Sequence, residues 1–312
     1  MDISKFLTLV QSSSEIGLLY ALTVLSLFLS YSMLNVCDLS TDGCWTFGGA
    51  VGAVVAIAGH PWLSIPAAML AGMLSGFVTA VLQTRMGVNS LLAGIVVNTA
   101  LYSVNISVMG KAQLSMNKTS TVFTMMKEAL QNTGIPVLYP LYNLFVGLIA
   151  VLAVILFLSL FLRTRLGLAI RATGNNPDMV RSSSINPKNT TLVGLCISNA
   201  FTALSGCLFA QYQKSLDINA GSGILTVALA SLLIGGVFFG IRRRIPLRAL
   251  GAVIGAVIFR LVYGIALRLQ MPSHMLKAVS SAIVVLTISI PYLKKQWPML
   301  QRRLSKGGNG HA

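Results

Sequence analysis

The chain has 312 residues, of which 55% are hydrophobic and 10% charged, and its mean hydropathy is +0.78. Soluble domains carry about 25% charged residues, so this composition excludes an ordinary soluble protein and a disordered one. Lys and Arg outnumber Asp and Glu by 23 to 7, which gives a net charge of +16. In a membrane protein such an excess belongs to cytoplasmic loops beside anionic lipid, so we do not expect nucleic acid as a partner.

Apolar stretches predict where the chain crosses the bilayer, since a crossing helix needs about 20 apolar residues. The stretches are 16–37, 43–84, 86–110, 141–162, 189–213, 218–241, 247–269 and 278–293. The second is interrupted at Gly59-His60-Pro61 and suits two short segments. The sequence therefore predicts an all-α, polytopic membrane bundle of eight or nine segments, forming a single transmembrane domain over 1–312.

Three regions rich in Lys and Arg predict the orientation of the bundle. They are 163–188, 242–248 and 294–306, and they hold 14 of the 23 cations. An even number of predicted segments separates each pair, so we expect all three in the cytoplasm, together with the basic tail 294–312. The side of the N-terminus depends on whether 43–60 is a full crossing, and it stays open.

Small residues at helix-packing spacing predict close contacts between helices in lipid. The pairs are Gly48/Gly52, Gly72/Gly76 and Gly251/Gly255. They indicate a compact bundle, and they fit packing either within one subunit or across a dimer.

A short sequence pattern that occurs twice indicates two structural repeats. Phe28-Leu-Ser-Tyr31 leads to Asp38 and Asp42-Gly43, and Phe209-Ala-Gln-Tyr212 leads to Asp217 and Gly221-Ser-Gly223. Transporters built from inverted repeats often place broken helices at corresponding positions. We expect repeats over 16–110 and 141–293; the alternative is a pair of ordinary helix ends with polar turns.

The chain lacks the motifs of nucleotide binding and of common hydrolases, namely GxxxxGK[ST], HExxH and GxSxG. Ser205-Gly206 resembles the nucleophile setting of a membrane serine protease, but neither His60 nor His274 lies in a matching pattern. All seven acids fall near predicted segment ends or in loops, which disfavours a proton-coupled carrier. We therefore expect a pathway driven from elsewhere: not an enzyme, with no bound cofactor and no metal.

One basic loop contains signals for helix starts and helix ends in a definite order. From Arg171 to Asn186 we predict a helix end, a Gly-Asn turn at Gly174, a short helix near 177–184 begun by Asn176-Pro177, and a stop at Asn186-Pro187. A merely basic cytoplasmic loop would explain the arginines but not this order of turn, helix and turn.

This loop resembles the permeases of bacterial ATP-binding-cassette importers for branched-chain amino acids, ribose and related solutes. The family pattern runs Arg-Ala-x-Gly-x-Asn, then Arg, then Gly-Ile-Asn, and Ser184 stands here where Gly is usual. The matching residues are Arg171, Ala172, Gly174, Asn176, Arg181, Ile185 and Asn186. Asp38-Leu39-Ser40 and Ala220-Gly-Ser-Gly223 match further family segments. The run from Ser90 to Asn105 resembles most the tryptophan/tyrosine-type branch, many members of which have Glu in place of Gly236.

The resemblance implies a permease subunit in the bacterial inner membrane, which dimerises with a second permease copy. It implies an external solute-binding protein and a cytoplasmic ATPase dimer that uses the ATP. It assigns ATPase coupling to the loop with Arg171, Gly174, Asn176, Asp178, Arg181, Ile185 and Asn186. We expect a small solute, an amino acid with aromatic ones included, to pass Asp38, Asp42, Asn98, Asp217 and Arg260. The alternative is a self-contained carrier or channel with inverted repeats.

Arg260 lies twelve residues after Arg248, about 18 Å along a helix, and forms one stripe with Gly264 and Arg268. An unpaired guanidinium facing lipid would cost at least about 2.5–3.5 kcal/mol, so we expect the stripe to face protein or a wet cavity. Two roles stay open: bonding to carbonyls of a broken helix near Gly235-Gly236, or attracting the carboxylate of a passing amino acid.

Overall fold

The computed structural model describes residues 3–117, 119–132, 141–239 and 244–268, together with positions 275, 278, 280–286 and 289. The first elements are α1 (Ile3–Leu27), its π-helical continuation η1 (Phe28–Met33), α2 (Thr41–Ile57), α3 (Ser64–Thr84), α4 (Ser90–Met109), β1 (Gln113–Ser115) and α5 (Val122–Asn132). The others are α6 (Tyr142–Phe161), α7 (Arg165–Asn175), α8 (Pro177–Ser182), α9 (Pro187–Gln213), β2 (Ser215–Asp217), α10 (Ile224–Phe239) and α11 (Ile245–Arg268). The tail 294–312 lies outside the described residues.

Six of the described helices are long and apolar enough to cross a membrane. They are Leu7–Met33, Ser64–Thr84, Ser90–Met109, Tyr142–Phe161, Pro187–Gln213 and Ile245–Arg268. Two apolar helices are shorter, Thr41–Ile57 and Ile224–Val237. The prediction of an all-α, polytopic bundle is confirmed. The count of eight or nine segments is not, because only six described helices reach the full length, two are shorter, and segment 278–293 is described only in part.

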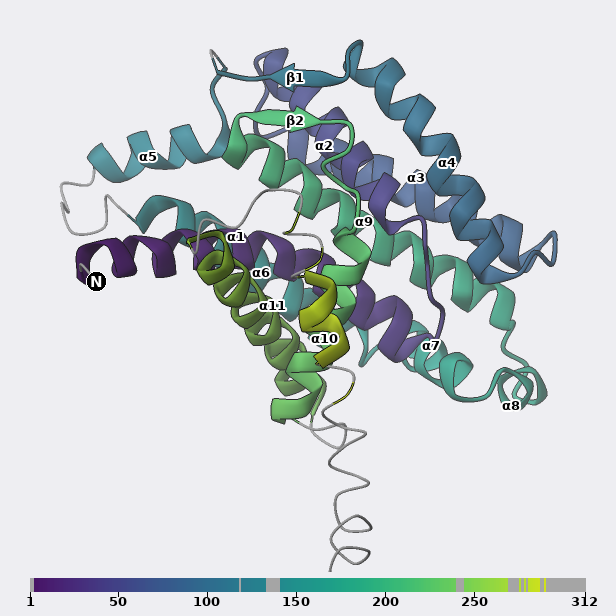
Figure 1. The fold of residues 1–312 in the computed structure, drawn as a ribbon. Helices are drawn as coiled ribbons and strands as arrows, with labels where there is room; N and C mark the ends of the chain where they lie inside the picture. The colour runs from purple at the N-terminus through teal and green to yellow at the C-terminus, as the bar shows by residue number, and fades with distance from the viewer. Residues whose placement is uncertain are drawn as a thin grey trace, which may run out of the picture.

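Helix α9 is the central element, and contacts fix the direction of its neighbours. The Ser205 hydroxyl donates to the Leu19 carbonyl, and Ser26 bonds to Ser198, so α1 runs antiparallel to α9. We call the end that carries β1 and β2 the ribbon end, and the end that carries α7 and α8 the loop end (Figure 1). In the ribbon, which is antiparallel, Leu114 lies opposite Leu216.

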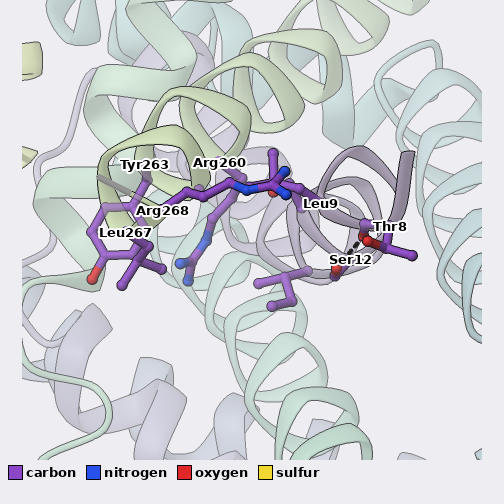
Figure 2. A pocket seen from close by; sticks show the side chains of 10 residues that line it. Thr8, Leu9, Ser12, Arg260, Tyr263, Leu267 and Arg268 are labelled. Carbon is purple, nitrogen blue, oxygen red and sulfur yellow. Dashed lines mark hydrogen bonds between the residues drawn. The ribbon is translucent and has the colours of Figure 1, made fainter. Parts of the chain in front are cut away.

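Helix α11 runs antiparallel along the first half of α1. A side chain at Gly17 would meet the backbone of Val257, and one at Gly264 would meet the hydroxyl of Ser13. Arg260, Tyr263 and Arg268 of α11 therefore face the opening turns of α1 (Figure 2).

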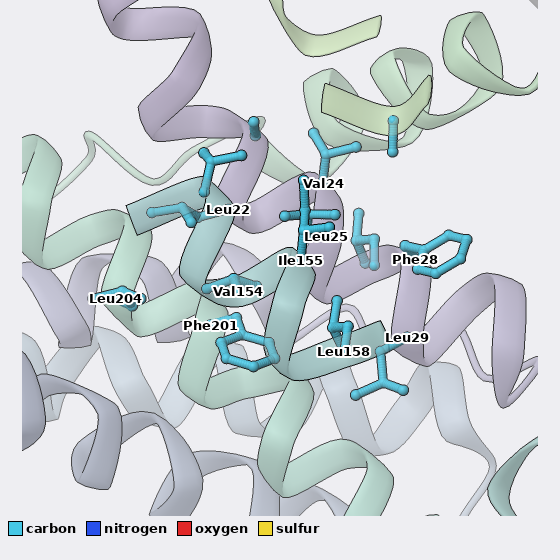
Figure 3. Packing of buried hydrophobic residues seen from close by; sticks show 14 of the residues in the cluster. Leu22, Val24, Leu25, Phe28, Leu29, Val154, Ile155, Leu158, Phe201 and Leu204 are labelled. Carbon is cyan, nitrogen blue, oxygen red and sulfur yellow. The ribbon is translucent and has the colours of Figure 1, made fainter. Parts of the chain in front are cut away.

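The main core is an apolar layer between α1, α6 and α9. Leu25 of α1 and Leu29 of η1 pack near Leu158 of α6 and Phe201 of α9 (Figure 3). Leu29 and Leu158 are fully buried. This layer fixes the two long antiparallel helices on which the rest of the bundle is arranged.

The small-residue pairs bring helices of the same chain into contact. Side chains at Gly48 and Gly52 would collide with Ala203 and Cys207 of α9, and side chains at Gly72 and Gly76 would meet Asn199. On α11, Gly255 lies against the Ser231 carbonyl, and the Gly251 carbonyl lies against Gly235 of α10. Each pair lets two backbones approach within one subunit.

The tightest of these crossings gives a stability prediction. A Cβ at Gly206 would coincide with the Trp45 carbonyl, so Gly206→Ala is expected to cost about 1–3 kcal/mol in free energy of unfolding. Gly236→Ala is the matched control, because no atom lies within 4 Å of its Cβ position; it should gain about 0.5–1 kcal/mol through helix propensity. Thermal unfolding of the purified proteins measures both changes. Equal transition temperatures for the two variants would contradict this packing.

The predicted start of the first apolar segment is wrong. Glu15 lies inside the apolar helix Leu7–Met33 and is 5% exposed. Its carboxylate accepts hydrogen bonds from Gln11 (3.0 Å), Tyr212 (3.0 Å) and Asn143 (3.3 Å). The first apolar stretch therefore does not start at residue 16, because donors from α6 and α9 allow a buried acid there.

Candidate functional site

Two half-helices begin at the middle of the bundle. The Asp38 carboxylate, just before α2, accepts a hydrogen bond of 2.7 Å from Asn199, which lies near the midpoint of α9. From there α2 runs parallel to α9 towards the ribbon end. Helix α10 starts beside the first turn of α2 and runs antiparallel to α11 towards the loop end. The two short helices α2 and α10, which we call the half-helices, thus start at a similar depth and run towards opposite ends of the bundle.

Asp42 joins these two helix starts. It lies in the first turn of α2, and its carboxylate accepts from the backbone N–H groups of Gly223 (2.9 Å) and Leu225 (2.8 Å) at the start of α10. Gly223 adopts φ +88°, a conformation that glycine tolerates and other residues rarely adopt. Asp42 therefore satisfies N–H groups that α10 leaves open, and it complements the positive end of that helix.

Helix α4 closes the start of α2 from the other side. The Asn98 Oδ1 atom accepts from the Gly43 N–H at 2.7 Å, and the Asn105 amide donates to the Gly43 carbonyl at 3.2 Å. Asn105 is 1% exposed, and its Oδ1 atom has no hydrogen-bond partner among the described residues. The Asn105 Oδ1 atom is thus a buried acceptor beside the Gly43 contact whose hydrogen-bonding capacity the described residues leave unused.

These groups line one polar pocket of about 180 Å³ between α2, α4 and the turn before α10. Its lining residues are Asp42, Gly43, Thr46, Asn98, Thr99, Tyr102, Asn105, Ile218, Asn219, Gly221 and Ser222. The Tyr102 side chain is 49% exposed. The pocket combines amide, hydroxyl and aromatic groups inside an otherwise apolar bundle, as a solute pathway requires.

The predicted pathway residues do not all meet there. Asp42 and Asn98 line the pocket, whereas Asp38 is 2% exposed and is held by Asn199 and the Ser40 N–H. Asp217 ends β2, and its carboxylate caps the nearby turn by accepting from the Asn219 N–H. Neither Asp38 nor Asp217 is among the residues that line the pocket.

Arg260 lies in a different cavity, between α1 and α11, with Gly264 and Arg268 (Figure 2). Its guanidinium stacks on the Tyr20 ring, 3.8 Å from the ring centroid. Gly235, near which Arg260 was considered to bond to backbone carbonyls, contacts the Gly251 backbone. Tyr20 was not anticipated as the partner, because nothing in the spacing of the sequence links the first helix to the eleventh.

The basic loop forms a short exposed helix at the loop end. Asn176 caps α8 by accepting from the N–H groups of Asp178 and Met179, each at 3.1 Å, and Pro177 occupies the first turn. The helix ends at Ser182, two residues earlier than predicted. Asn186-Pro187 begins α9 and does not simply end α8, since the Asn186 side chain accepts from the Lys188 N–H.

The expected turn at Gly174 is a further correction. Gly174 lies inside α7, where a side chain would collide with the Met33 carbonyl at the end of η1. The absence of a side chain at Gly174 therefore allows α7 to pack closely on η1. Arg171 lies on the same helix.

The outward side of α8 is polar with apolar edges. Arg181 and Asp178 are 64% and 86% exposed and form an ion pair of 3.7 Å. Met179 is 64% and Ile185 38% exposed, whereas Val180 is buried and fixes the helix to the bundle. Ser184 adopts φ +59°, which accounts for the glycine that the family pattern has there.

Sequence reasoning missed three residues of the pocket region: Asn105, Tyr102 and Asn199. Asn98 and Asn105 are seven residues apart on one apolar helix, so this heptad spacing was the available signal. Tyr102 lies between them. The pairing of Asn199 with Asp38 joins residues 161 positions apart and leaves no local signal.

Comparison with known proteins gives consistent matches along nearly the whole chain. A family model described as the permease component of branched-chain amino acid transport systems matches residues 12–288. The tyrosine transport system permease of Clostridioides difficile is 30% identical over 271 residues, which cover 86% of each chain. The guanosine permease NupQ of Bacillus subtilis is 29% identical over 79% of this chain and 73% of its own. The ribose permease RbsC of Escherichia coli is 26% identical over 83% of this chain and 78% of its own.

No solved structure matches the chain significantly. The family match spans all the described spanning helices except the first residues of α1. The chain therefore belongs to the permease family of ATP-binding-cassette importers of the branched-chain amino acid and ribose type: it is a multi-span inner-membrane transport subunit, not an enzyme, and it works with a separate ATPase and a solute-binding protein.

Proposed function

We propose that this chain forms half of the pathway for a small solute, an amino acid, with aromatic amino acids as the preferred class. The observation that carries this proposal is the polar pocket where the half-helices α2 and α10 begin. A second permease copy supplies the other half, an ATPase dimer binds at the loop end, and a binding protein delivers solute at the ribbon end.

The pocket chemistry suits an amino acid. The Asp42 carboxylate and the unpaired Asn105 Oδ1 atom, which belong to two lining residues of the pocket, favour the ammonium group of an amino acid. The exposed ring of Tyr102 offers a stacking face to an aromatic side chain. The tyrosine permease of C. difficile supports this class, whereas relatives named for guanosine and ribose define the competing solutes.

A homodimer completes this pathway. Thr99 and Tyr102 on the pocket side of α4 are exposed in the single chain, so the pocket is open along that helix. A water-filled groove that faces lipid would leave polar groups in hydrocarbon. A second copy that packs across this side encloses the groove, and Asp42 and Asn98 of each copy then line a common path.

The loop end is the cytoplasmic end in this proposal, because the positive-inside rule assigns Arg163, Arg165, Arg171 and Arg181 to that side. The same rule predicts the cytoplasmic side for the basic tail 294–312. The two long helices α1 and α9, each followed by a half-helix, are the matching parts of the inverted repeats 16–110 and 141–293. The first repeat then includes the start of α1 at Ile3.

ATP hydrolysis by the purified complex tests the solute class. We expect binding protein loaded with tyrosine or tryptophan to stimulate hydrolysis several-fold, and Asn105→Ala to remove that stimulation while basal hydrolysis persists. Binding protein presented with guanosine or with ribose is the comparison. Stimulation by guanosine or ribose alone would contradict the amino-acid assignment and leave the family assignment intact.

A further inference from the structure

Another polar cavity, of about 340 Å³, lies at the loop end beside α8. It shares no lining residue with the pocket of Asp42 and Asn98. One wall is formed by the end of α3, the following turn and the first residue of α4, and the other by α7, α8 and the start of α9. We call this cavity the loop-end groove. Its lining residues include Thr84, Val88 and Ser90 on the first wall and Arg181, Lys188 and Thr191 on the second.

The loop-end groove carries positive charge. Lys188, in the first turn of α9, is exposed and forms no ion pair among the described residues. Arg181 already forms the ion pair of 3.7 Å with Asp178, so Lys188 supplies the charge that stays uncompensated. Because no Asp or Glu lines the groove among the described residues, its electrostatic potential favours a negatively charged group.

Uncharged donors surround Lys188 on both walls. Ser90 and Thr191 line opposite walls and are partly exposed, and their hydroxyl groups form no hydrogen bond with the described residues. Ser90 is the first residue of α4 and Thr191 lies in the opening turns of α9, so both stand where a helix N-terminus adds partial positive charge. A carboxylate in the groove can therefore accept hydrogen bonds from both walls.

The surroundings of the groove favour a protein as its partner. The wall formed by α8 lies in water, because Asp178 and Arg181 are 86% and 64% exposed. Met179 of α8 is 64% exposed, and Met86, two residues before Val88, is 69% exposed. Methionine is enriched in protein interfaces. A free anion would use the charge of Lys188 but not these apolar neighbours.

We propose that the loop-end groove binds an acidic side chain of the ATPase subunit, so that the ATPase contacts the turn between α3 and α4 as well as α8. This proposal rests on the assignment of the loop end to the ATPase. Lys188 is the charged partner of the acid, and the hydroxyl groups of Ser90 and Thr191 donate hydrogen bonds to it.

The contact links the ATPase to the solute pocket through one helix. Ser90 begins α4, and the same helix carries Asn98 and Asn105 of the pocket. Ser90 and Asn105 are 15 residues apart, about 22 Å along the helix. Rigid secondary elements carry coupling between distant sites, so a displacement of the turn before Ser90 would reach the pocket directly.

Carbodiimide cross-linking of the assembled permease–ATPase complex tests this contact. The reagent joins a carboxylate to an amine where the two touch, and mass spectrometry identifies the linked peptides. We expect Lys188 to be linked to an Asp or Glu of the ATPase. Lys188→Arg should remove this link, because a guanidinium does not form the amide. It should keep solute-stimulated ATP hydrolysis near the wild-type rate, because the charge remains.

Lys188→Glu should lower solute-stimulated hydrolysis about tenfold, since it places like charges against each other. Lys111→Glu is the matched control, because it reverses an exposed lysine at the ribbon end and should leave hydrolysis unchanged. Protein amounts are determined in parallel.

Two results would overturn the groove contact and leave the role of α8 intact. They are an unlinked Lys188 in a complex that is cross-linked through other residues, and unchanged stimulated hydrolysis in Lys188→Glu. Binding of phosphatidylglycerol that Lys188→Glu abolishes, together with an unlinked Lys188, would assign the groove to a lipid head group instead. The absence of any link between permease and ATPase would contradict the assignment of the loop end itself.

Discussion

Arg181→Glu is expected to uncouple ATP hydrolysis from solute uptake. Arg181 lies on the exposed side of α8, and the family pattern places a positive residue there. Reversing its charge puts an acid beside Asp178, so the helix would repel any acidic partner of Arg181 on the ATPase. We expect solute-stimulated hydrolysis and uptake to fall by at least about tenfold, since breaking a charge pair in an interface costs several kcal/mol.

Protein folding should survive this change. The Asp178–Arg181 pair is exposed, and such pairs contribute about 0–1 kcal/mol. Arg163→Glu is the matched control, because it reverses an exposed charge at the loop end outside α8. Uptake and hydrolysis are measured in the reconstituted complex with protein amounts determined in parallel. Normal stimulated hydrolysis and normal uptake in Arg181→Glu would exclude α8 as the coupling helix.

Asp42→Ala is expected to destabilise the permease and to abolish transport. The change removes two charge-assisted hydrogen bonds to the Gly223 and Leu225 N–H groups, at a cost of about 3 kcal/mol. Because these bonds join α2 to α10, the turn before α10 should lose its position against the pocket. Asp42→Asn keeps one acceptor and should lie between the wild type and Asp42→Ala in transition temperature.

Asp217→Asn is the control for Asp42, because both acids were expected in the pathway from sequence. Among the described residues the Asp217 carboxylate accepts from the nearby Asn219 N–H, and an asparagine oxygen replaces that acceptor. Thermal unfolding and uptake should both stay close to wild type. Equal losses for Asp42→Ala and Asp217→Asn would show that the bridge between the half-helices has no special role.

Local rules predicted the start of the short helix in the basic loop 171–186 well. Asn176 and Pro177 start α8 as helix-capping preferences require, because capping depends on residues two or three positions apart. Gly174 was misread as a turn, because its small size serves a contact with Met33, 141 positions away. A rule based on neighbouring residues cannot detect such a contact.

The apolar pattern likewise predicted the helical bundle but missed how polar groups are buried in it. Glu15 was taken to end the first segment, yet donors from α6 and α9 accommodate it within α1. The bridge from Asp42 to α10 joins residues about 180 positions apart. Asp42 and Asn98 were expected in the pathway, but the pocket that contains them depends on tertiary contacts that the sequence does not display.

Uptake into proteoliposomes tests most directly whether this permease is driven by separate ATPases. The liposomes contain the permease with or without its ATPase, ATP is enclosed inside, and tyrosine-loaded binding protein is added outside. The proposed mechanism predicts uptake only when permease, ATPase, ATP and binding protein are all present. Equal uptake by the permease alone, without ATPase or ATP, would identify a self-contained carrier and contradict the account.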